Sequence, residues 1–314
     1  MATERALLVA FGGLGNGILL SPLFRALATR HTVDLLVADP LVAEYYAAAP
    51  ARGDLLLWRD CGWAGLLRRR GHWTLAVAGA AMQPLRAGLL LLAAGAPQRI
   101  AEHGFACTAR VSVAEPEEHE LQRNLRLAAA AGCPGMPEPA LWSLTLDGVP
   151  ALPTRFVALH AGSGGRLAGK RWPLDRFAAL TRMLIAGRIP VVALGGPDET
   201  GLGHTLAAAG AVDLCGRLSL AQTAGVLRAA SLYVGNDSGL MHLAAAAGTR
   251  CCALFGPTRE AKNAPWGNGH RVLTAPVGCR PCYANRPITC PHGYACLSGI
   301  SVEQVHAAVR DLLA

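Results

Sequence analysis

The sequence predicts an α/β protein of two domains, each with a parallel sheet covered by helices, that face one another across a cleft. The chain has 314 residues, about twice the usual length of one domain. Short apolar runs alternate with helical patterns in both halves, which is typical of parallel sheets. Five prolines between Pro134 and Pro153 mark a linker between the halves.

In the first half, the apolar run 5–11 ends in the glycine-rich segment Gly12–Gly17, so we expect a strand, a turn and a helix. Residues 85–94 are very apolar but too few to cross a bilayer, and we expect a buried helix there. A face that rests on a lipid surface stays open as an alternative. Two further strands are expected at 33–37 and 75–78, and a helix at 117–131.

The second half repeats this pattern. Each expected strand is an apolar run that ends near glycine or a polar residue, and each helix begins after such a segment. We expect strands at 156–159, 190–194, 232–234 and 251–255, and helices at 174–186, 219–230, 239–247 and 302–313. A short strand near Trp142–Leu146 is also expected inside the linker.

These patterns divide the chain into three parts. Residues 1–148 form an N-terminal domain and residues 149–300 a C-terminal domain, which includes the cysteine-rich segment 279–296. The last part, 301–314, is a terminal helix that is expected to pack back on the first domain.

The net positive charge of the chain comes from its second half. Residues 1–150 hold 13 Arg against 13 acidic residues, whereas residues 151–314 hold 16 basic against 8 acidic residues, which gives the whole net charge of +8. A basic half indicates an anionic ligand, and we favour a phosphorylated small molecule over nucleic acid, because the Arg residues are scattered with few aromatics between them. The start of the chain lacks a signal-peptide pattern, so we expect a cytoplasmic protein, with its position at the inner membrane face left open.

Three turns at expected strand ends are suited to an anion, because ligands of such sheets bind beyond the carboxyl ends of the strands, where helix N-termini present free N–H groups. The first is Gly12–Gly17, with Gly13 and Gly15. The second is His160–Gly165, followed by Lys170 and Arg171. The third is Gly235–His242, near the strand end that carries Gly195, Gly196 and Glu199. Glu199 is placed to accept hydrogen bonds from a ribose.

The residues carry a resemblance to glycosyltransferase family 9, the ADP-heptose:lipopolysaccharide heptosyltransferases. The most specific stretch is Val234–Thr258, VGNDSGLMHLAAAAGTRCCALFGPT. Others are His160-x-Gly162 with Lys170–Pro173, Gly195–Glu199, Cys215–Gly216 and Gly12–Leu27. The resemblance implies the GT-B fold, two Rossmann-like domains, with the acceptor in the first domain and the nucleotide sugar in the second. It also implies an inverting transfer without a catalytic metal.

The resemblance also assigns roles. Lys170 would contact the phosphates, Glu199 the ribose, and Asp237 the sugar and diphosphate. Developing charge on the departing diphosphate would be stabilised by Lys170 and by helix N–H groups. The full set of expected substrate-binding residues is Gly13, Gly15, His160, Gly162, Ser163, Arg171, Gly195, Gly196, Glu199, Ser238, Gly239 and His242, with Asn16, Lys170 and Asp237 as the catalytic group.

One departure concerns the opening loop. The family carries Gly-Asp there, and the Asp is its expected general base, but this chain has Gly15-Asn16. An amide cannot take a proton at neutral pH, so Asn16 cannot fill that role. Another group could serve, with Asp34, Asp39, Asp60 and His103 as candidates. Alternatively, the acceptor is a better nucleophile, or the protein binds a nucleotide sugar without transferring it.

A cysteine cluster follows the resembling stretch. Cys279, Cys282, Cys290 and Cys296 fall within 18 residues, and four thiolates favour structural Zn or Fe. Some family members carry a similar segment that binds iron. Reduced thiols, or one disulfide formed on isolation, remain the alternative.

The sequence therefore predicts an inverting glycosyltransferase that moves a sugar, favoured as heptose from ADP-heptose, to an acceptor hydroxyl without a cofactor for catalysis. The acceptor is left open between lipopolysaccharide core, a protein and a small metabolite, and the oligomeric state is not predicted. The alternatives are an impaired nucleotide-sugar-binding protein and a GT-B sugar-nucleotide epimerase.

Overall fold

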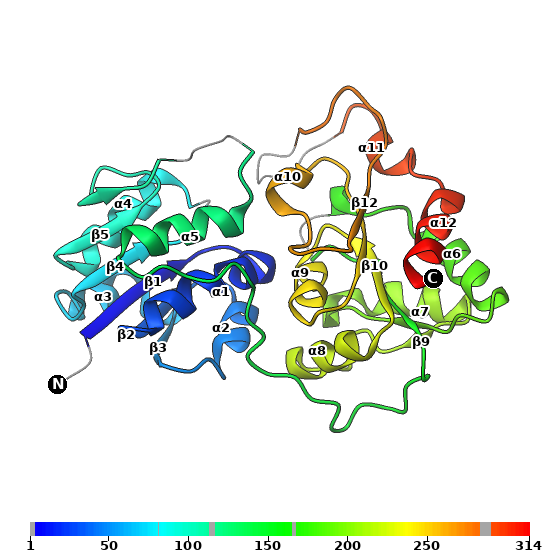
Figure 1. Ribbon diagram of the computed structural model, residues 1–314, viewed down its shortest axis with the longest axis horizontal. Helices are drawn as coiled ribbons and strands as arrows, with labels where there is room; N and C mark the ends of the chain where they lie inside the picture. The colour runs from blue at the N-terminus through cyan, green and yellow to red at the C-terminus, as the bar shows by residue number, and fades with distance from the viewer. Residues whose placement is uncertain (1–3, 81, 113–116, 165–167, 283–289) are drawn as a thin grey trace. The chain divides into compact units, whose positions relative to one another are not determined.

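The computed structural model describes residues 4–80, 82–112, 117–164, 168–282 and 290–314. The chain divides into two compact units, unit 1 (Met1–Trp142) and unit 2 (Ser143–Ala314). Each unit contains one six-stranded sheet in which all described pairings are parallel. Figure 1 follows the elements of each unit in chain order.

In unit 1 the sheet has the order β3-β2-β1-β4-β5-β6, so the chain starts in the middle and its direction of growth reverses between β1 and β4. The strands are β1 (Glu4–Ala10), β2 (His31–Val37), β3 (Arg52–Leu57), β4 (Leu75–Ala78), β5 (Gln98–Ala101) and β6 (Ala109–Arg110). The helices are α1 (Leu14–Ala28), α2 (Pro40–Tyr46), α3 (Trp58–Arg68), α4 (Pro84–Ala94) and α5 (Glu120–Ala130).

The unit 1 core forms because β1 buries five consecutive residues, as a central parallel strand with both faces covered does. Gly17 allows α1 and α2 to approach closely, since a Cβ there would lie 2.9 Å from Val42. Helix α5 is tied to α1 through Asn124, which donates to the carbonyl of Leu19 (3.1 Å). Its Oδ1 also accepts the N–H of Ala80 (2.9 Å), directly after β4. The start of α5 is thereby held at the carboxyl end of this sheet.

In unit 2 the sheet has the order β12-β11-β10-β7-β8-β9, and the reversal lies between β7 and β10. The strands are β7 (Val157–His160), β8 (Val191–Ala193), β9 (Val212–Asp213), β10 (Leu232–Asn236), β11 (Cys251–Leu254) and β12 (Arg271–Leu273). The helices are α6 (Leu174–Ala186), α7 (Thr200–Ala208), α8 (Leu220–Ala229), α9 (Gly239–Ala246), α10 (Glu260–Asn263), α11 (Ala295–Ser298) and α12 (Val302–Leu313), with two 3-10 turns, η1 (Ala168–Lys170) and η2 (Pro197–Glu199).

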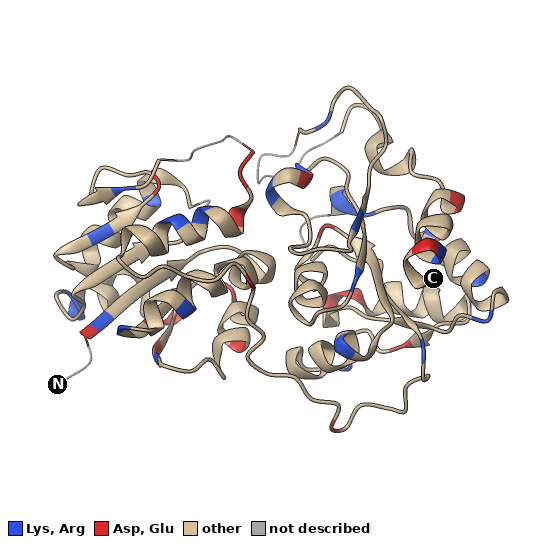
Figure 2. Cartoon of the chain, viewed as in Figure 1, with Lys and Arg blue, Asp and Glu red and all other residues tan. Residues whose placement is uncertain are grey.

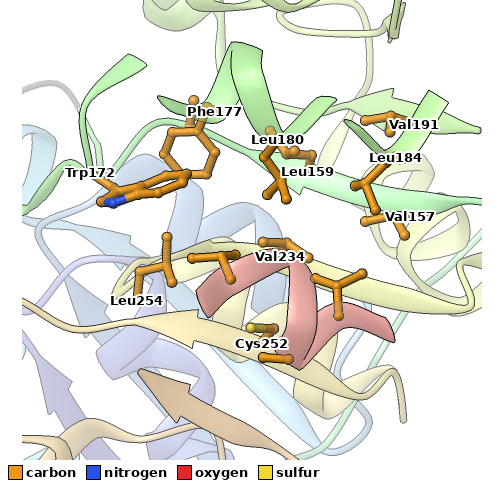
Figure 3. Close-up of a cluster of buried hydrophobic side chains, with 14 of the residues drawn as sticks. Val157, Leu159, Trp172, Phe177, Leu180, Leu184, Val191, Val234, Cys252 and Leu254 are labelled. Carbon is orange, nitrogen blue, oxygen red and sulfur yellow. The ribbon is translucent and has the colours of Figure 1, made fainter. Parts of the chain in front are cut away.

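The unit 2 core is a layer of aliphatic and aromatic side chains between the sheet and α6 (Figure 3). Trp172 and Phe177 pack edge to face with ring centroids 4.9 Å apart, and both are fully buried. The terminal helix α12 belongs to this core, because Val305 and Val309 are buried in it and the helix packs against α6. A capping box between Ser301 and Gln304 starts the helix.

Two sequence expectations need correction. Residues Trp142–Leu146 form no strand; instead the N–H of Thr145 donates to the carbonyl of Ala221 in α8 (3.1 Å). Helix α4 is buried on one face only, since Leu85, Leu89 and Leu92 on the other face are 67, 39 and 39% exposed.

Among the described residues, no helix combines the length and the apolar character that a membrane span needs. Basic residues are dispersed over the elements of both units (Figure 2).

Candidate functional site

The candidate site of unit 2 lies where β7 and β10 end side by side. His160 is the last residue of β7 and pairs with Gly235 of β10, directly before Asn236 and Asp237. This is the point at which the order of strands in the sheet reverses. Ligands of open α/β sheets bind at such a point, because the loops that leave the two strands separate there.

Glu199, at the end of η2, organises the loop that follows β7. Its Oε1 accepts the backbone N–H groups of Ser163 (3.1 Å) and Gly164 (3.2 Å). Its Oε2 accepts the N–H of Gly196 (3.1 Å) and lies 2.9 Å from Nε2 of His160. Burial raises the pKa of Glu199, but the hydrogen bonds from His160 and from the backbone outweigh it and lower the pKa to about 2. Because a carboxylate has about four acceptor positions, these contacts already occupy its capacity.

The predicted glycines explain how this carboxylate fits. A Cβ on Gly162 would lie 1.8 Å from Oε1 of Glu199, and one on Gly195 would lie 3.1 Å from Oε2. Gly162 and Gly195 therefore admit the carboxylate between two strand ends. The resemblance assigns Glu199 to a ribose, and a ribose hydroxyl would have to exchange with one of the existing hydrogen bonds.

His160 connects this carboxylate to the next helix. The imidazole is 2% exposed, and its Nδ1 lies 3.2 Å from Oγ of Ser238. Ser238 caps α9, where its Oγ accepts the N–H of Met241 (3.4 Å). The hydroxyl of Tyr233 lies 3.3 Å from the same Oγ, and burial raises the pKa of Tyr233 well above its ordinary value. His160 thus contacts both Glu199 and Ser238, and it fixes the positions of these two predicted site residues.

Lys170 and Asp237 form an ion pair at the surface end of the site. Nζ of Lys170 lies 2.7 Å from Oδ2 of Asp237, and the two side chains are 12% and 6% exposed. Arg171 lies beside them, with Nε donating to Oγ of Ser163 (3.3 Å) and Nη2 lying 3.7 Å from Glu199. Two cations, Lys170 and Arg171, and two carboxylates, Asp237 and Glu199, therefore lie together at the carboxyl end of this sheet.

The remaining predicted residues of this half lie around the same edge. Gly239 opens α9, and His242, four residues after the capping Ser238, is buried on that helix. Gly196 donates to Glu199, and the N–H of Gly216 donates to the carbonyl of Gly195 (2.9 Å). The structure thus brings the residues predicted for unit 2 to one end of one sheet.

Asn236 is a residue of this site that the sequence reading did not single out. Its side chain is fully buried; Nδ2 donates to the carbonyls of Ala161 and Gly162 (3.0 Å each), and Oδ1 accepts the N–H of Trp172 (2.9 Å). Asn236 therefore clamps the loop after β7 to the segment that follows Lys170. Its place at a strand end, before Asp237, was the available signal.

In unit 1 the turn that leaves β1 lies at the equivalent reversal point, between β1 and β4, but it is shorter than the expected Gly12–Gly17, because α1 already begins at Leu14. Asn16 is exposed and donates from Nδ2 to both carboxylate oxygens of Glu120, at 2.8 and 2.9 Å. Glu120 begins α5 and is 5% exposed. Gly13 is the N-cap residue of α1 and Gly15 lies in its first turn. A Cβ on Gly13 would lie 3.5 Å from Oδ2 of Asp39.

The carboxylates and the His proposed to replace a missing base are spread over unit 1. Asp34 is fully buried and accepts hydrogen bonds from Arg5 and Trp73. Asp39 caps α2 by accepting the N–H of Leu41 (2.9 Å). Asp60 is exposed on α3, and His103 is exposed after β5. Sequence reasoning missed Glu120, because its contact with Asn16 joins residues 104 positions apart.

The four cysteines of the expected metal site lie in or near the last loop of unit 2. Cys279 and Cys282 are exposed, Cys290 is half-buried, and Cys296 is buried in α11. Burial raises the pKa of Cys296, and the neighbouring Cys282, Cys290 and Cys279 raise it further. Within the part of the chain that the structure describes, no three His, Cys, Asp or Glu side chains are grouped to hold a metal ion. Residues 283–289 lie outside the described ranges.

Residues 85–291 match the model of the family described as glycosyltransferase family 9 (heptosyltransferase). The lipopolysaccharide heptosyltransferase 2 of Salmonella typhimurium is 33% identical over 116 residues, which cover 35% of this chain and 33% of that protein. The matches to curated relatives span about a third of the relatives' length.

Solved structures resemble the chain over nearly its whole length. The glycosyl transferase family 9 protein from Veillonella parvula has a TM-score of 0.78 at 18% identity and covers 100% of this chain and 98% of that one. The E. coli ADP-heptose lipopolysaccharide heptosyltransferase II has a TM-score of 0.74 at 21% identity, with 99% and 98% covered. The iron-containing glycosyltransferase TibC of enterotoxigenic E. coli has 0.66 at 13%, with 99% and 76% covered. These likenesses confirm the predicted fold class of two parallel sheets with helices.

Proposed function

The chain belongs to glycosyltransferase family 9, and on that premise we propose that it transfers a sugar, by inversion, from a nucleoside-diphosphate donor to an acceptor hydroxyl. The favoured donor is ADP-heptose and the favoured acceptor is lipopolysaccharide core. Relatives carry these words in their names, as ADP-heptose lipopolysaccharide heptosyltransferase II and lipopolysaccharide heptosyltransferase 2. Residues 1–148 are proposed to hold the acceptor and residues 149–300 the donor.

The observation that carries this proposal is the ion pair of Lys170 and Asp237 at the strand reversal of unit 2. A diphosphate that enters there would meet the Lys170 ammonium, the Arg171 guanidinium and the N-terminus of α9, all of which favour negative charge. Breaking the bond between the sugar and the diphosphate increases the negative charge on the leaving group. The same groups would then stabilise the transition state more than the ground state.

Asp237 is proposed to hold the sugar and to keep the Lys170 ammonium in place before the donor binds. Glu199 is proposed to serve in two ways: it fixes the loop Gly162–Gly164 through backbone N–H groups, and it meets the ribose by exchanging one of these contacts. His160, which is buried beneath both Glu199 and Ser238, is proposed to position them rather than to touch the donor.

The experiment that tests this function combines binding and turnover. The purified protein is heated with ADP-, UDP-, GDP- and dTDP-sugars, and nucleotide release is then measured with a truncated lipopolysaccharide core as acceptor. We expect ADP-heptose to raise Tm most and to release ADP only when the acceptor is present. Protection without release would favour the sugar-nucleotide-binding protein that Asn16 suggests. Isomerisation of the sugar without release would favour an epimerase.

We further propose that Cys279, Cys282, Cys290 and Cys296 bind a structural Zn or Fe ion. Support comes from the spacing of the four cysteines, which fall within 18 residues, and from the preference of these metals for four thiolates. The fold relative TibC is described as iron-containing. The ion would hold the loop that leads into α12.

The cytoplasmic location, at the inner membrane face or away from it, stays a prediction.

A further inference from the structure

In unit 1 a buried acid on α5 lies beside the start of α1, where the sequence around Asn16 gives no sign of it. Glu120 is 5% exposed, and both of its carboxylate oxygens lie within 2.9 Å of Nδ2 of Asn16. Asn16 stands at the start of α1 and Glu120 at the start of α5, at the carboxyl end of the sheet where β1 and β4 diverge. A carboxylate at such a point lies where the ligands of open α/β sheets bind.

The pairing has a chemical direction. An amide nitrogen donates and an ionised carboxylate only accepts, so the contact needs one amide and one ionised acid. If both members were acids, two negative charges would lie at hydrogen-bond distance, and one of them would retain a proton. The pair therefore has its acid on α5 and its amide on α1.

The surroundings keep Glu120 in place. Asn124, one turn further along α5, binds the carbonyl of Leu19 on α1 and the N–H of Ala80 after β4. Arg123, the nearest cation on the helix, forms a two-pronged ion pair with the buried Glu102, with Nε 2.6 Å from Oε1. The positive charge beside Glu120 is therefore matched by a second carboxylate.

We propose that Glu120 is the general base of the transfer, an inference that rests on the proposed function. The Glu120 carboxylate takes the proton of the acceptor hydroxyl while the hydroxyl oxygen bonds to C1 of the sugar. The bond between C1 and the phosphate oxygen breaks at the same time, and its electron pair leaves with the nucleoside diphosphate. Asn16, the exposed member of the pair, orients the carboxylate, and the hydroxyl approaches from its side.

Two other carboxylates of unit 1 are less suited. Asp34 accepts the N–H groups of Arg5, Trp73 and Asp54, and its fully buried side chain is enclosed by these donors. Asp39 lies near Gly13, but one of its oxygens caps α2. Asp39 therefore provides a matched control, because Asn caps a helix as well as Asp does.

The test is an exchange of acid and amide. Glu120→Gln should lower kcat for ADP release, with ADP-heptose and truncated lipopolysaccharide core, by about 10²–10⁴. The Kd for ADP and the Tm should stay near those of the unaltered chain. The exchanged variant Asn16→Asp/Glu120→Gln rebuilds one acid and one amide with the positions reversed, and it should regain at least about tenfold of that loss. Asp39→Asn should stay within about threefold of the unaltered kcat.

Each other outcome is decisive. Retained turnover in Glu120→Gln would overturn the assignment. An exchanged variant no faster than Glu120→Gln would also overturn it, because only a structural role would explain the loss. A slow Asp39→Asn beside a fast Glu120→Gln would assign the base to Asp39. If the unaltered chain itself releases no nucleotide from any sugar donor, the proposed function fails first, and the base assignment falls with it.

Discussion

Lys170 and Asp237, which are 67 residues apart, form a nearly buried ion pair at the carboxyl end of the unit 2 sheet. The two residues expected to hold the donor thus hold one another before it arrives. On the proposed function, an incoming diphosphate would meet a cation that is already oriented, and binding would not need to order a mobile lysine. Because both side chains are nearly buried, the charge of each one is compensated by the other.

Replacing Asp237 by Ala should abolish the binding of ADP-heptose and leave the Lys170 ammonium buried without its counter-charge. Loss of one partner of a buried pair costs about 3–5 kcal/mol, so the urea midpoint of unfolding should also fall. Binding is measured by calorimetry. The matched control is Asp311→Ala, which breaks the exposed pair of Arg271 and Asp311 (2.8 Å) and should change little. Unchanged affinity in Asp237→Ala would exclude this donor site.

Glu199→Gln should remove a pH-dependent contribution to stability. The pKa of Glu199 is about 2 in the fold, below its ordinary value of 4.5, so the ionised form stabilises the fold above pH 4.5. That stabilisation, about 3 kcal/mol at neutral pH, is lost as the pH falls toward 2. Urea unfolding at pH 7 should therefore separate the variant from the unaltered chain, and unfolding at pH 2.5 should bring them together. The exposed neighbour variant Asp198→Asn should follow the unaltered chain at both pH values.

Asn16→Asp alone should slow the transfer at pH 7. The new carboxylate would face Glu120 at hydrogen-bond distance, so the two acids would share a proton and neither would be a free acceptor. Turnover should rise again as the pH is raised, because the shared proton is lost. The measurement is kcat from pH 6 to 9. Faster transfer at pH 7 would mean that Asp at this position acts independently of Glu120.

The purified protein should contain Zn or Fe bound through the cysteine segment. Elemental analysis is expected to find the metal in the unaltered chain and to lose it in Cys282→Ser. Cys133→Ser, which alters a buried thiol of unit 1, should retain it. A metal-free protein purified without chelators, or equal metal in both variants, would contradict the assignment.

The sequence predicted the central strands and the turns after them, because a buried run that ends in glycine, as at β1 and β7, is a local signal. It missed β3 and β12, whose residues are mostly half-buried and show no clear alternation. It also missed β5, β6 and β9, which are only four, two and two residues long. Glu120 is one of three acidic residues near the start of the helix expected at 117–131, and in the sequence it has no feature that sets it apart. Only its tertiary contact with Asn16 distinguishes it, and residue spacing carries no record of that contact. Asn236 could not be recognised for the same reason, because its side chain binds the backbone of Ala161 and Trp172, which lie far from it in the sequence.

Gly162 imposes a restriction that reaches beyond its own loop. Any side chain there, even a single methyl group, would occupy the space of the Glu199 oxygen. Substituting Gly162 would therefore displace the Glu199 carboxylate and break its hydrogen bonds to the backbone N–H groups of Ser163 and Gly164. Variants designed to test the proposed donor site should therefore keep Gly162 unchanged.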